Sequence, residues 1–370
     1  MDGIYYNILS STDRTVEVTY KDTDYNSYSG EVSIPDKLTY SGIEFTVTEI
    51  GKYAFYESTG LSSVKIPDSV VSINDKSFMF CTGLTEIKIP DSVVSIGEDV
   101  FWDCGYLKKV DLGNSVVTIG EYAFHGCSNL AGVIIPNSVT TIGPSAFSMC
   151  SSLQSIALPS SVTSIGDNMF EECTSLTSVI LSESLTEITE YMFASCTSLK
   201  TIDIPKSVTH ISLNAFSDSG LESIVIPDEV IRIEPSAFYG CLNMKEVMIG
   251  KSVMNIRSGV FRNCTTLTSI TSLNPDAPEC YSDTFTDVNK VQCKVYVPEG
   301  SVDAYKAAEG WKEFLFIEPI SDSGVDETGV DAEDVTAVGY YDLQGVRLDA
   351  PAKGVNIVVY SDGTRRKVVL

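Results

Sequence analysis

Apolar and polar positions along the middle of the chain repeat with a period of 23 residues. Each unit follows the pattern L-x-x-V-x-I-P-x-S-V-x-x-I-G-x-x-A-F-x-x-C-x-x, and its leucine is taken as position 1. The spacing shortens to 22 residues once, between Leu199 and Leu221, and a degenerate leading copy spans residues 47–60. About ten coils follow from units that begin at Leu61, Leu84, Leu107, Leu130, Leu153, Leu176, Leu199, Leu221, Met244 and Leu267.

The spacing of apolar positions within one unit predicts its local structure. Positions 1, 4 and 6 suit a short strand with one buried face, which a proline or glycine then ends. Positions 10 and 13 suit a second short extended segment, and glycine at 14 with Ala-Phe at 17 and 18 suits a turn into one helical or 3₁₀ turn. A unit this small cannot fold alone, so the pattern predicts stacked coils in a β-rich parallel solenoid.

Three columns of residues are expected to run along this solenoid. Phenylalanine at position 18 should form an internal stack, whereas serine at position 9 should bond to backbone in each turn. The cysteines at position 21 could suggest a metal site, but no C-x₂-C pair or histidine joins them, which favours free, buried thiols. These cysteines are Cys81, Cys104, Cys127, Cys150, Cys173, Cys196, Cys241 and Cys264, and Ser219 takes their place in the short unit.

The repeat closely resembles the bacterial leucine-rich repeats of the BspA-like or Treponema pallidum type, over residues 40–320. Phenylalanine recurs at one position in nine full units and in the leading copy. The resemblance implies a leucine-rich repeat solenoid with 23-residue coils, capped at both ends. It also implies adhesion, because some BspA-like proteins bind host matrix or plasma glycoproteins such as fibronectin and fibrinogen.

Five regions are expected along the chain. Residues 1–46 alternate like a hairpin and should cap the first coil; residues 47–270 form the repeat solenoid. Residues 271–320 should form a C-terminal cap of a strand, a short helix and a final strand, in which Tyr305 and Trp311 serve packing. Cys280 and Cys293 lie in this cap, where an exported protein could form one disulfide.

Residues 321–338 contain six acidic residues and no basic one, which is typical of a solvated linker. Residues 339–370 alternate like a small β module. Their Y-D-L-Q-G and K-G-V-N-I-V-V elements resemble the C-terminal tails of exported Bacteroidetes proteins, where such tails serve sorting or attachment.

Charge and composition exclude several classes of function. The formal net charge is −25, which disfavours nucleic acid and anionic lipid surfaces as partners. No apolar stretch is long enough to insert into a membrane, and the start lacks a basic and then apolar export signal. With two histidines and no nucleophile, nucleotide or zinc motif, the sequence predicts no enzyme, no catalytic residue, no metal and no cofactor.

The candidate binding face is the outward side of the first strand of each unit. At position 5 the units carry an apolar column, which marks a protein-binding surface or reflects β-propensity alone. Met79, Trp102 and His125 at position 19 are either a second exposed cluster or a cover over the turns. The residues of the candidate column are Ile134, Ala157, Ile180, Val225 and Met248.

These observations favour a non-enzymatic, secreted or surface-displayed scaffold. It is expected to be a monomer that binds host or bacterial surface proteins through its extended sheet face. The alternative is a carbohydrate-binding or cell-envelope structural protein. Sugar binding predicts exposed aromatic residues on the sheet face, and the outward columns there hold none.

Overall fold

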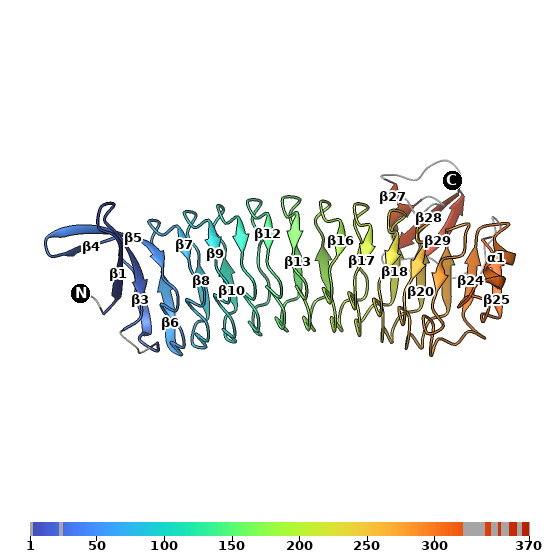
Figure 1. The fold of residues 1–370 in the computed structure, drawn as a ribbon, viewed down its shortest axis with the longest axis horizontal. Helices are drawn as coiled ribbons and strands as arrows, with labels where there is room; N and C mark the ends of the chain where they lie inside the picture. The colour runs from blue at the N-terminus through green and yellow to red at the C-terminus, as the bar shows by residue number, and fades with distance from the viewer. Residues whose placement is uncertain are drawn as a thin grey trace.

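The computed structural model describes residues 3–21 and 25–320, together with tail strands at 337–341, 347–348, 355–360 and 365–369. Residues 3–320 form an elongated stack of coils that runs from the N-terminal strands to a short helix and final strand at the other end (Figure 1). Most of the expected acidic linker, at 321–336, lies outside the described residues. The β-rich parallel solenoid predicted from the repeat is confirmed.

Most coils contribute one strand to a first ladder, at positions 3 to 6 of the repeat. The coil that begins at Leu130 joins it only through isolated bridges, from Val110 to Val133 and from Gly132 to Ser155, and the coil that begins at Leu199 has no strand there. Neighbouring strands are parallel and keep the same repeat position in register, as Val110 does with Ile87. Inward positions 4 and 6 are mostly buried and outward positions 3 and 5 are exposed or half-buried, which is the alternation of a strand with one covered face. The first ladder comprises β3 (Ser29–Ser33), β6 (Gly60–Lys65), β8 (Glu86–Lys88), β10 (Lys109–Asp111), β13 (Ser155–Ala157), β15 (Ser178–Ile180), β18 (Ser223–Ile226), β20 (Glu246–Ile249), β22 (Ser269–Ser272), β24 (Lys294–Val297) and β25 (Phe316–Pro319).

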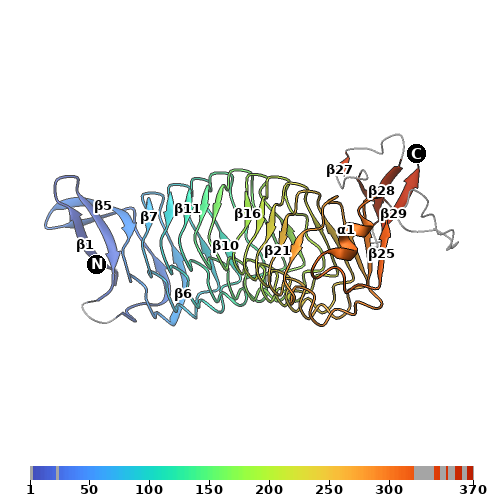
Figure 2. The ribbon, with the colours of Figure 1, turned by 45° about the vertical axis from the view of Figure 1, so that its right-hand side comes forward.

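A second ladder of shorter strands occupies positions 12 and 13, on another side of each coil (Figure 2). These strands are also parallel and in register, as Ile119 is with Ile142, and they form two sheets, one that ends at β14 and one that begins at β16. The second ladder comprises β5 (Ile43–Ile50), β7 (Ser72–Ile73), β9 (Ser95–Ile96), β11 (Thr118–Ile119), β12 (Thr141–Ile142), β14 (Ser164–Ile165), β16 (Glu187–Ile188), β17 (His210–Ile211), β19 (Arg232–Ile233), β21 (Asn255–Ile256) and β23 (Glu279–Cys280).

The phenylalanine column forms one continuous stack through the core. Adjacent ring centroids lie 4.8 to 6.1 Å apart, and the planes of adjacent rings differ by 20° at most. The structure adds Phe285 to the ten residues found by period. Tyr28 packs on the first ring, Phe55, and Trp311 on the last, Phe285, so aromatic residues close the stack at both ends. Trp311 is fully buried, and its expected packing role is confirmed.

The turn around each phenylalanine differs from the expected helical or 3₁₀ turn. Positions 16 and 20 adopt positive φ, for example 60° at Tyr53 and 54° at Glu57. A left-handed residue interrupts a right-handed helix, so the segment forms successive hydrogen-bonded turns instead. Within these turns the N–H of Phe55 donates to the carbonyl of Ser77 in the next coil, at 2.7 Å.

The cysteine column is buried, as expected, and its thiols also join the coils. Each of the eight thiols donates to the carbonyl of the phenylalanine one coil earlier; Cys150 Sγ lies 3.2 Å from the oxygen of Phe124. Burial raises the pKa of Cys150 to about 12, so this thiol stays protonated and available as a donor. Cys280 and Cys293 are also buried and free.

Five of the position-9 serines bond to backbone as predicted, and they do so between coils, whereas the buried hydroxyl of Ser161 has no hydrogen-bond partner. Ser92 Oγ donates to the carbonyl of Val70 at 2.6 Å, and Ser138 Oγ to that of Val116 at 2.7 Å. Together with the two strand ladders and the turn bonds, these contacts attach each coil to its neighbour at several points around its circumference.

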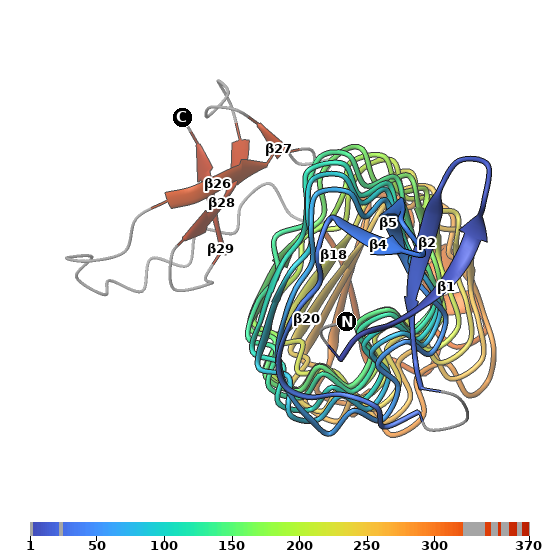
Figure 3. The ribbon, with the colours of Figure 1, turned by 90° about the vertical axis from the view of Figure 1, so that its left-hand side faces the viewer.

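Extra strands and one helix lie at the ends. β1 (Tyr5–Ser10) and β2 (Thr15–Thr19) form an antiparallel hairpin at the N-terminal end, where β4 (Lys37–Tyr40) pairs antiparallel with β5 (Figure 3). At the other end α1 (Val302–Ala307) lies between β24 and β25, which is the strand, helix and strand order expected there. The tail strands form an antiparallel sheet of β26 (Ala337–Tyr341), β27 (Arg347–Leu348), β28 (Val355–Tyr360) and β29 (Arg365–Val369).

Candidate functional site

The apolar column at position 5 faces solvent in three consecutive coils. Ile134 is 86% exposed and Ile180 is 64% exposed, and Ala157 lies exposed between them. Ala157 pairs in register with Ile180 on the next strand, so their side chains project from the same face of the first ladder. The neighbouring outward position 3 holds Gly132, Ser155 and Ser178, whose small side chains leave the apolar residues accessible.

Acidic side chains bound this patch along the column. Asp111 precedes Ile134 by one coil and Asp203 follows Ile180 by one coil, and both are exposed. Coils in a parallel ladder are about 4.8 Å apart, so the two carboxylates lie roughly 19 Å from each other along the column. We call Ile134, Ala157 and Ile180, together with these two aspartates, the central patch.

The other two candidates of the column belong to a separate part of the first ladder. Val225 and Met248 pair in register on β18 and β20, but both side chains are half-buried. Asp203 separates them from the central patch. The structure therefore divides the five candidate residues into an exposed group of three and a half-buried group of two.

The position-19 residues Trp102 and His125 contact each other at the turns. Their ring centroids are 4.5 Å apart, and both side chains are half-buried, as is that of Met79. Tyr122 packs on Trp102 at 4.8 Å, and the indole N–H of Trp102 donates to Asp103 at 3.2 Å. These contacts cover the turns of two successive coils, and burial lowers the pKa of His125.

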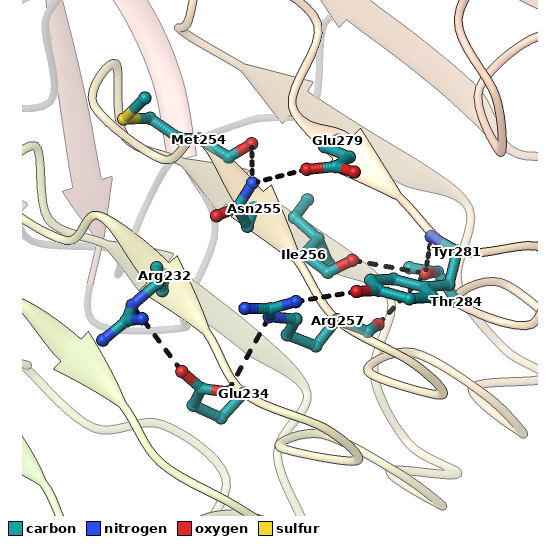
Figure 4. A network of polar contacts seen from close by, with 9 residues as sticks. All are labelled: Arg232, Glu234, Met254, Asn255, Ile256, Arg257, Glu279, Tyr281 and Thr284. Atoms are coloured by element: carbon teal, nitrogen blue, oxygen red, sulfur yellow. Dashed lines mark hydrogen bonds and ion pairs between the residues drawn. The ribbon is translucent and has the colours of Figure 1, made fainter.

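A polar network on the second ladder was not foreseen from the sequence (Figure 4). Glu234 lies 3.7 Å from Arg232 and 3.9 Å from Arg257, which donates to the hydroxyl of Tyr281 at 2.7 Å. The sequence does carry a sign of this network. In the coil that begins at Leu221, Arg232 and Glu234 occupy positions 12 and 14, where several earlier coils carry serine or threonine and then glycine.

This network links coils instead of surrounding a space for a reactant. Asn255 on β21 donates to Glu279 on β23 at 3.0 Å, so every contact so far described joins neighbouring coils or residues two apart. Opposite charges that neutralise one another in this way are typical of structural ion pairs at a protein surface. We assign the network to the attachment of the last coils.

Among the described residues, Asp99 is the aspartate or glutamate with the most deeply buried side chain. Its side chain is buried, one oxygen has no hydrogen-bond partner, and Lys76 Nζ lies 3.3 Å from the other. Burial raises the pKa of Asp99 to about 6, and the ammonium of Lys76 partly opposes that shift. Glu98 Oε1 also lies 3.7 Å from Lys76 Nζ, so two adjacent carboxyl groups share one ammonium group at this point.

The described part of the chain contains neither a candidate metal site nor a helix that could span a membrane. No group of three or more His, Cys, Asp or Glu side chains there is arranged to hold a metal ion. Among the same residues, no helix has the length and apolar character needed to cross a membrane.

Comparison with known proteins identifies the repeat. The family described as BspA type leucine rich repeat region matches six copies, over residues 48–176, 117–245 and 210–302. No curated protein matches the sequence.

Two solved structures illustrate the likeness of fold. A leucine-rich repeat protein from Bacteroides ovatus is 26% identical, with a TM-score of 0.56, over 82% of this chain and 80% of that one. The pneumococcal vaccine antigen PcpA is 20% identical, with a TM-score of 0.50, over 87% of this chain and 98% of that one, and shows the fold alone. From the repeat, the solenoid and the matching family, this chain belongs to the BspA-type leucine-rich repeat proteins, a family of bacterial repeat scaffolds of the surface type.

Proposed function

We propose that this chain is a non-enzymatic binding scaffold, secreted or displayed on the cell surface, which binds another protein through the central patch. The exposure of Ile134 and Ile180 on one outward column carries the proposal. Apolar side chains held in water by a rigid ladder lose unfavourable hydration when a partner covers them. A flat, rigid sheet also binds without paying for loop ordering.

The charges around the central patch indicate the charge of a complementary partner surface. Asp111 and Asp203 lie at its two ends, so a complementary surface has an apolar centre with basic side chains roughly 19 Å apart. Matrix and plasma glycoproteins of a host, such as fibronectin and fibrinogen, are the partners that the repeat type favours. Binding of this kind makes the protein an adhesin.

The test is surface binding to a panel of purified matrix and plasma glycoproteins. Wild-type protein is compared with the double variant Ile134→Lys, Ile180→Lys and with a matched control, Val94→Lys, which changes an exposed valine at position 11. The proposal expects the double variant to lose at least tenfold in affinity and the control to bind like the wild type. Equal binding by all three proteins, or no binding by the wild type, would overturn it.

A second pair of variants tests the charge argument. Asp111→Lys with Asp203→Lys reverses both ends of the patch and leaves its apolar centre intact. Association should slow and become less sensitive to salt if the partner presents basic residues there.

A further inference from the structure

The N-terminal end of the solenoid contains a cavity of about 550 Å³. It lies among β1, β2, β4 and β5, the four strands at the end of the solenoid that faces the viewer in Figure 3. Its volume falls within the range of small-molecule binding sites in proteins. The cavity is remote in sequence from the central patch, since its lining residues all precede residue 46.

Strand pairing fixes the walls of the cavity. β1 and β2 form one hairpin, β4 and β5 form another, and β2 pairs parallel with β5, so both hairpins belong to one sheet. The buried hydroxyl of Tyr28 accepts from the N–H of Tyr5 at 3.1 Å and donates to the carbonyl of Thr19. This hydroxyl therefore ties β1 to the end of β2 beneath the cavity.

The lining combines aromatic rings with uncharged hydrogen-bonding groups. None of the residues that line it carries a formal charge. The amide of Asn7 is oriented by Glu17, whose carboxylate accepts from it at 2.9 Å, and the amide oxygen remains an acceptor. The aromatic members of the lining are Tyr5, Tyr6, Tyr20, Tyr40 and Phe45.

Further tyrosines extend the aromatic surface beyond the cavity. The ring of Tyr20 lies 4.7 Å from that of Tyr25, which in turn lies 5.5 Å from Tyr53 and 5.3 Å from Tyr56. Tyr53 and Tyr56 occupy positions 16 and 19 of the leading copy. Later coils fold with small polar residues at those two positions, including Ser145, Asn168 and Asn214 at 16 and Ser148 and Ser217 at 19. The coil itself therefore does not require rings there.

We propose that this cavity and the adjoining tyrosines bind a neutral oligosaccharide. The faces of aromatic rings pack on the apolar C–H faces of sugar rings, while phenol and amide groups exchange hydrogen bonds with sugar hydroxyls. An uncharged lining offers no cation to pair with a carboxylate, sulfate or phosphate, and the net charge of −25 repels such anions. The four tyrosine hydroxyls and Asn7 distinguish the cavity from a site for a purely apolar ligand.

The experiment is calorimetric titration of the full chain with defined probes. The neutral probes are cellohexaose, maltohexaose, mannohexaose and xylohexaose, the anionic probe is hexagalacturonate, and the apolar probe is Nile red. At least one neutral hexasaccharide should bind, and hexagalacturonate should not.

Two matched tyrosine variants locate the binding. Tyr40→Ala removes a lining ring that is 52% exposed, whereas Tyr106→Ala removes a ring that is 62% exposed elsewhere on the surface. We expect at least a tenfold loss of affinity for Tyr40→Ala and none for Tyr106→Ala. Asn7→Ala, at a second exposed lining residue, serves as an independent variant, with thermal unfolding recorded for each protein.

Several results would overturn this proposal. They are no binding by any neutral probe, equal binding of hexagalacturonate, unchanged affinity in both Tyr40→Ala and Asn7→Ala, and saturable binding of Nile red alone. The variant Ile134→Lys, Ile180→Lys should bind the oligosaccharide normally. Sugar binding and protein binding can thus fail independently.

Discussion

At position 18 every coil from Phe78 to Phe261 carries phenylalanine, whereas at position 5 the same coils carry lysine, aspartate, isoleucine, alanine, valine and methionine. The first column lies in the core, where each ring contacts the rings above and below it. The second column faces solvent or is half-buried, and no neighbouring coil imposes a shape on it. Uniform columns therefore build the scaffold, and function is to be sought where an outward column departs from the residues that folding requires.

The largest effect is expected from the core column. Phe147→Ala removes a ring that lies 5.3 Å from Phe124 and 6.1 Å from Phe170, and leaves a cavity in the stack. We expect a loss of about 3 to 5 kcal/mol in the free energy of unfolding, measured by urea denaturation. Tyr106→Ala provides the exposed control, with a change within about 0.5 kcal/mol. Similar losses in both variants would remove the distinction between the columns.

A smaller effect is expected from the cysteine column. Cys150→Ser retains a donor toward the carbonyl of Phe124 but places a more polar hydroxyl among buried apolar groups. We expect a cost of about 1 to 2 kcal/mol in the same assay. The reverse change, Ser219→Cys, acts at a natural serine of this column, 3.3 Å from Cys241, and should stabilise the protein. If Cys150→Ser left the free energy of unfolding unchanged, the size of the side chain alone, and not its polarity, would matter in this column.

The buried carboxyl of Asp99 gives a pH-dependent prediction. Its folded pKa of about 6 exceeds the ordinary value of 3.8, so the folded state binds a proton more tightly than the unfolded state. The contribution of Asp99 to stability must then fall as pH rises from about 4 to about 6. Asp99→Asn, which tolerates the positive φ of 55° at this position, should remove that decline, with an effect on the order of 1 kcal/mol.

Unfolding titrations at several pH values between 4 and 8 provide the measurement. The difference in stability between the variant and the wild type should grow in favour of the variant as pH rises through this window. A wild type whose relative stability instead increased with pH would mean that the ion pair with Lys76 dominates over burial.

The smallest effect on stability is expected on the outward column. Ile134→Lys replaces a side chain that is 86% exposed, so the free energy of unfolding should change by less than about 0.5 kcal/mol. The same substitution places a cation in the central patch and should weaken partner binding. If Ile134→Lys unfolds the protein, the assignment of position 5 to the outward face is wrong.

The repeat made most of the fold predictable, because each inward position carries the same type of apolar residue in many successive units of one sequence. The order of strand, helix and strand around Tyr305 and Trp311 was also readable, since each element has its own local pattern. The left-handed residues at positions 16 and 20 were not. They include Tyr53, Glu57 and Phe80, which have no preference for positive φ, and the stacking of neighbouring coils selects that conformation.

The candidate sites were predictable to different degrees. Alternation within a strand was enough to place Ile134 and Ile180 outside, but not to show that Val225 and Met248 are half-buried, because burial depends on neighbouring groups. The N-terminal cavity lay beyond sequence reasoning. Its walls come from residues as far apart as Tyr5 and Phe45, and only the pairing of β2 with β5 brings the two hairpins together.

The attachment of each coil to its immediate neighbours also determines how this protein should respond to force. Tension applied between its two ends loads the bonds between coils in series, so coils should detach one at a time from an end. Each detached coil of 23 residues releases about 80 Å of extended chain. A scaffold of this design should extend in steps under load while its remaining coils stay folded.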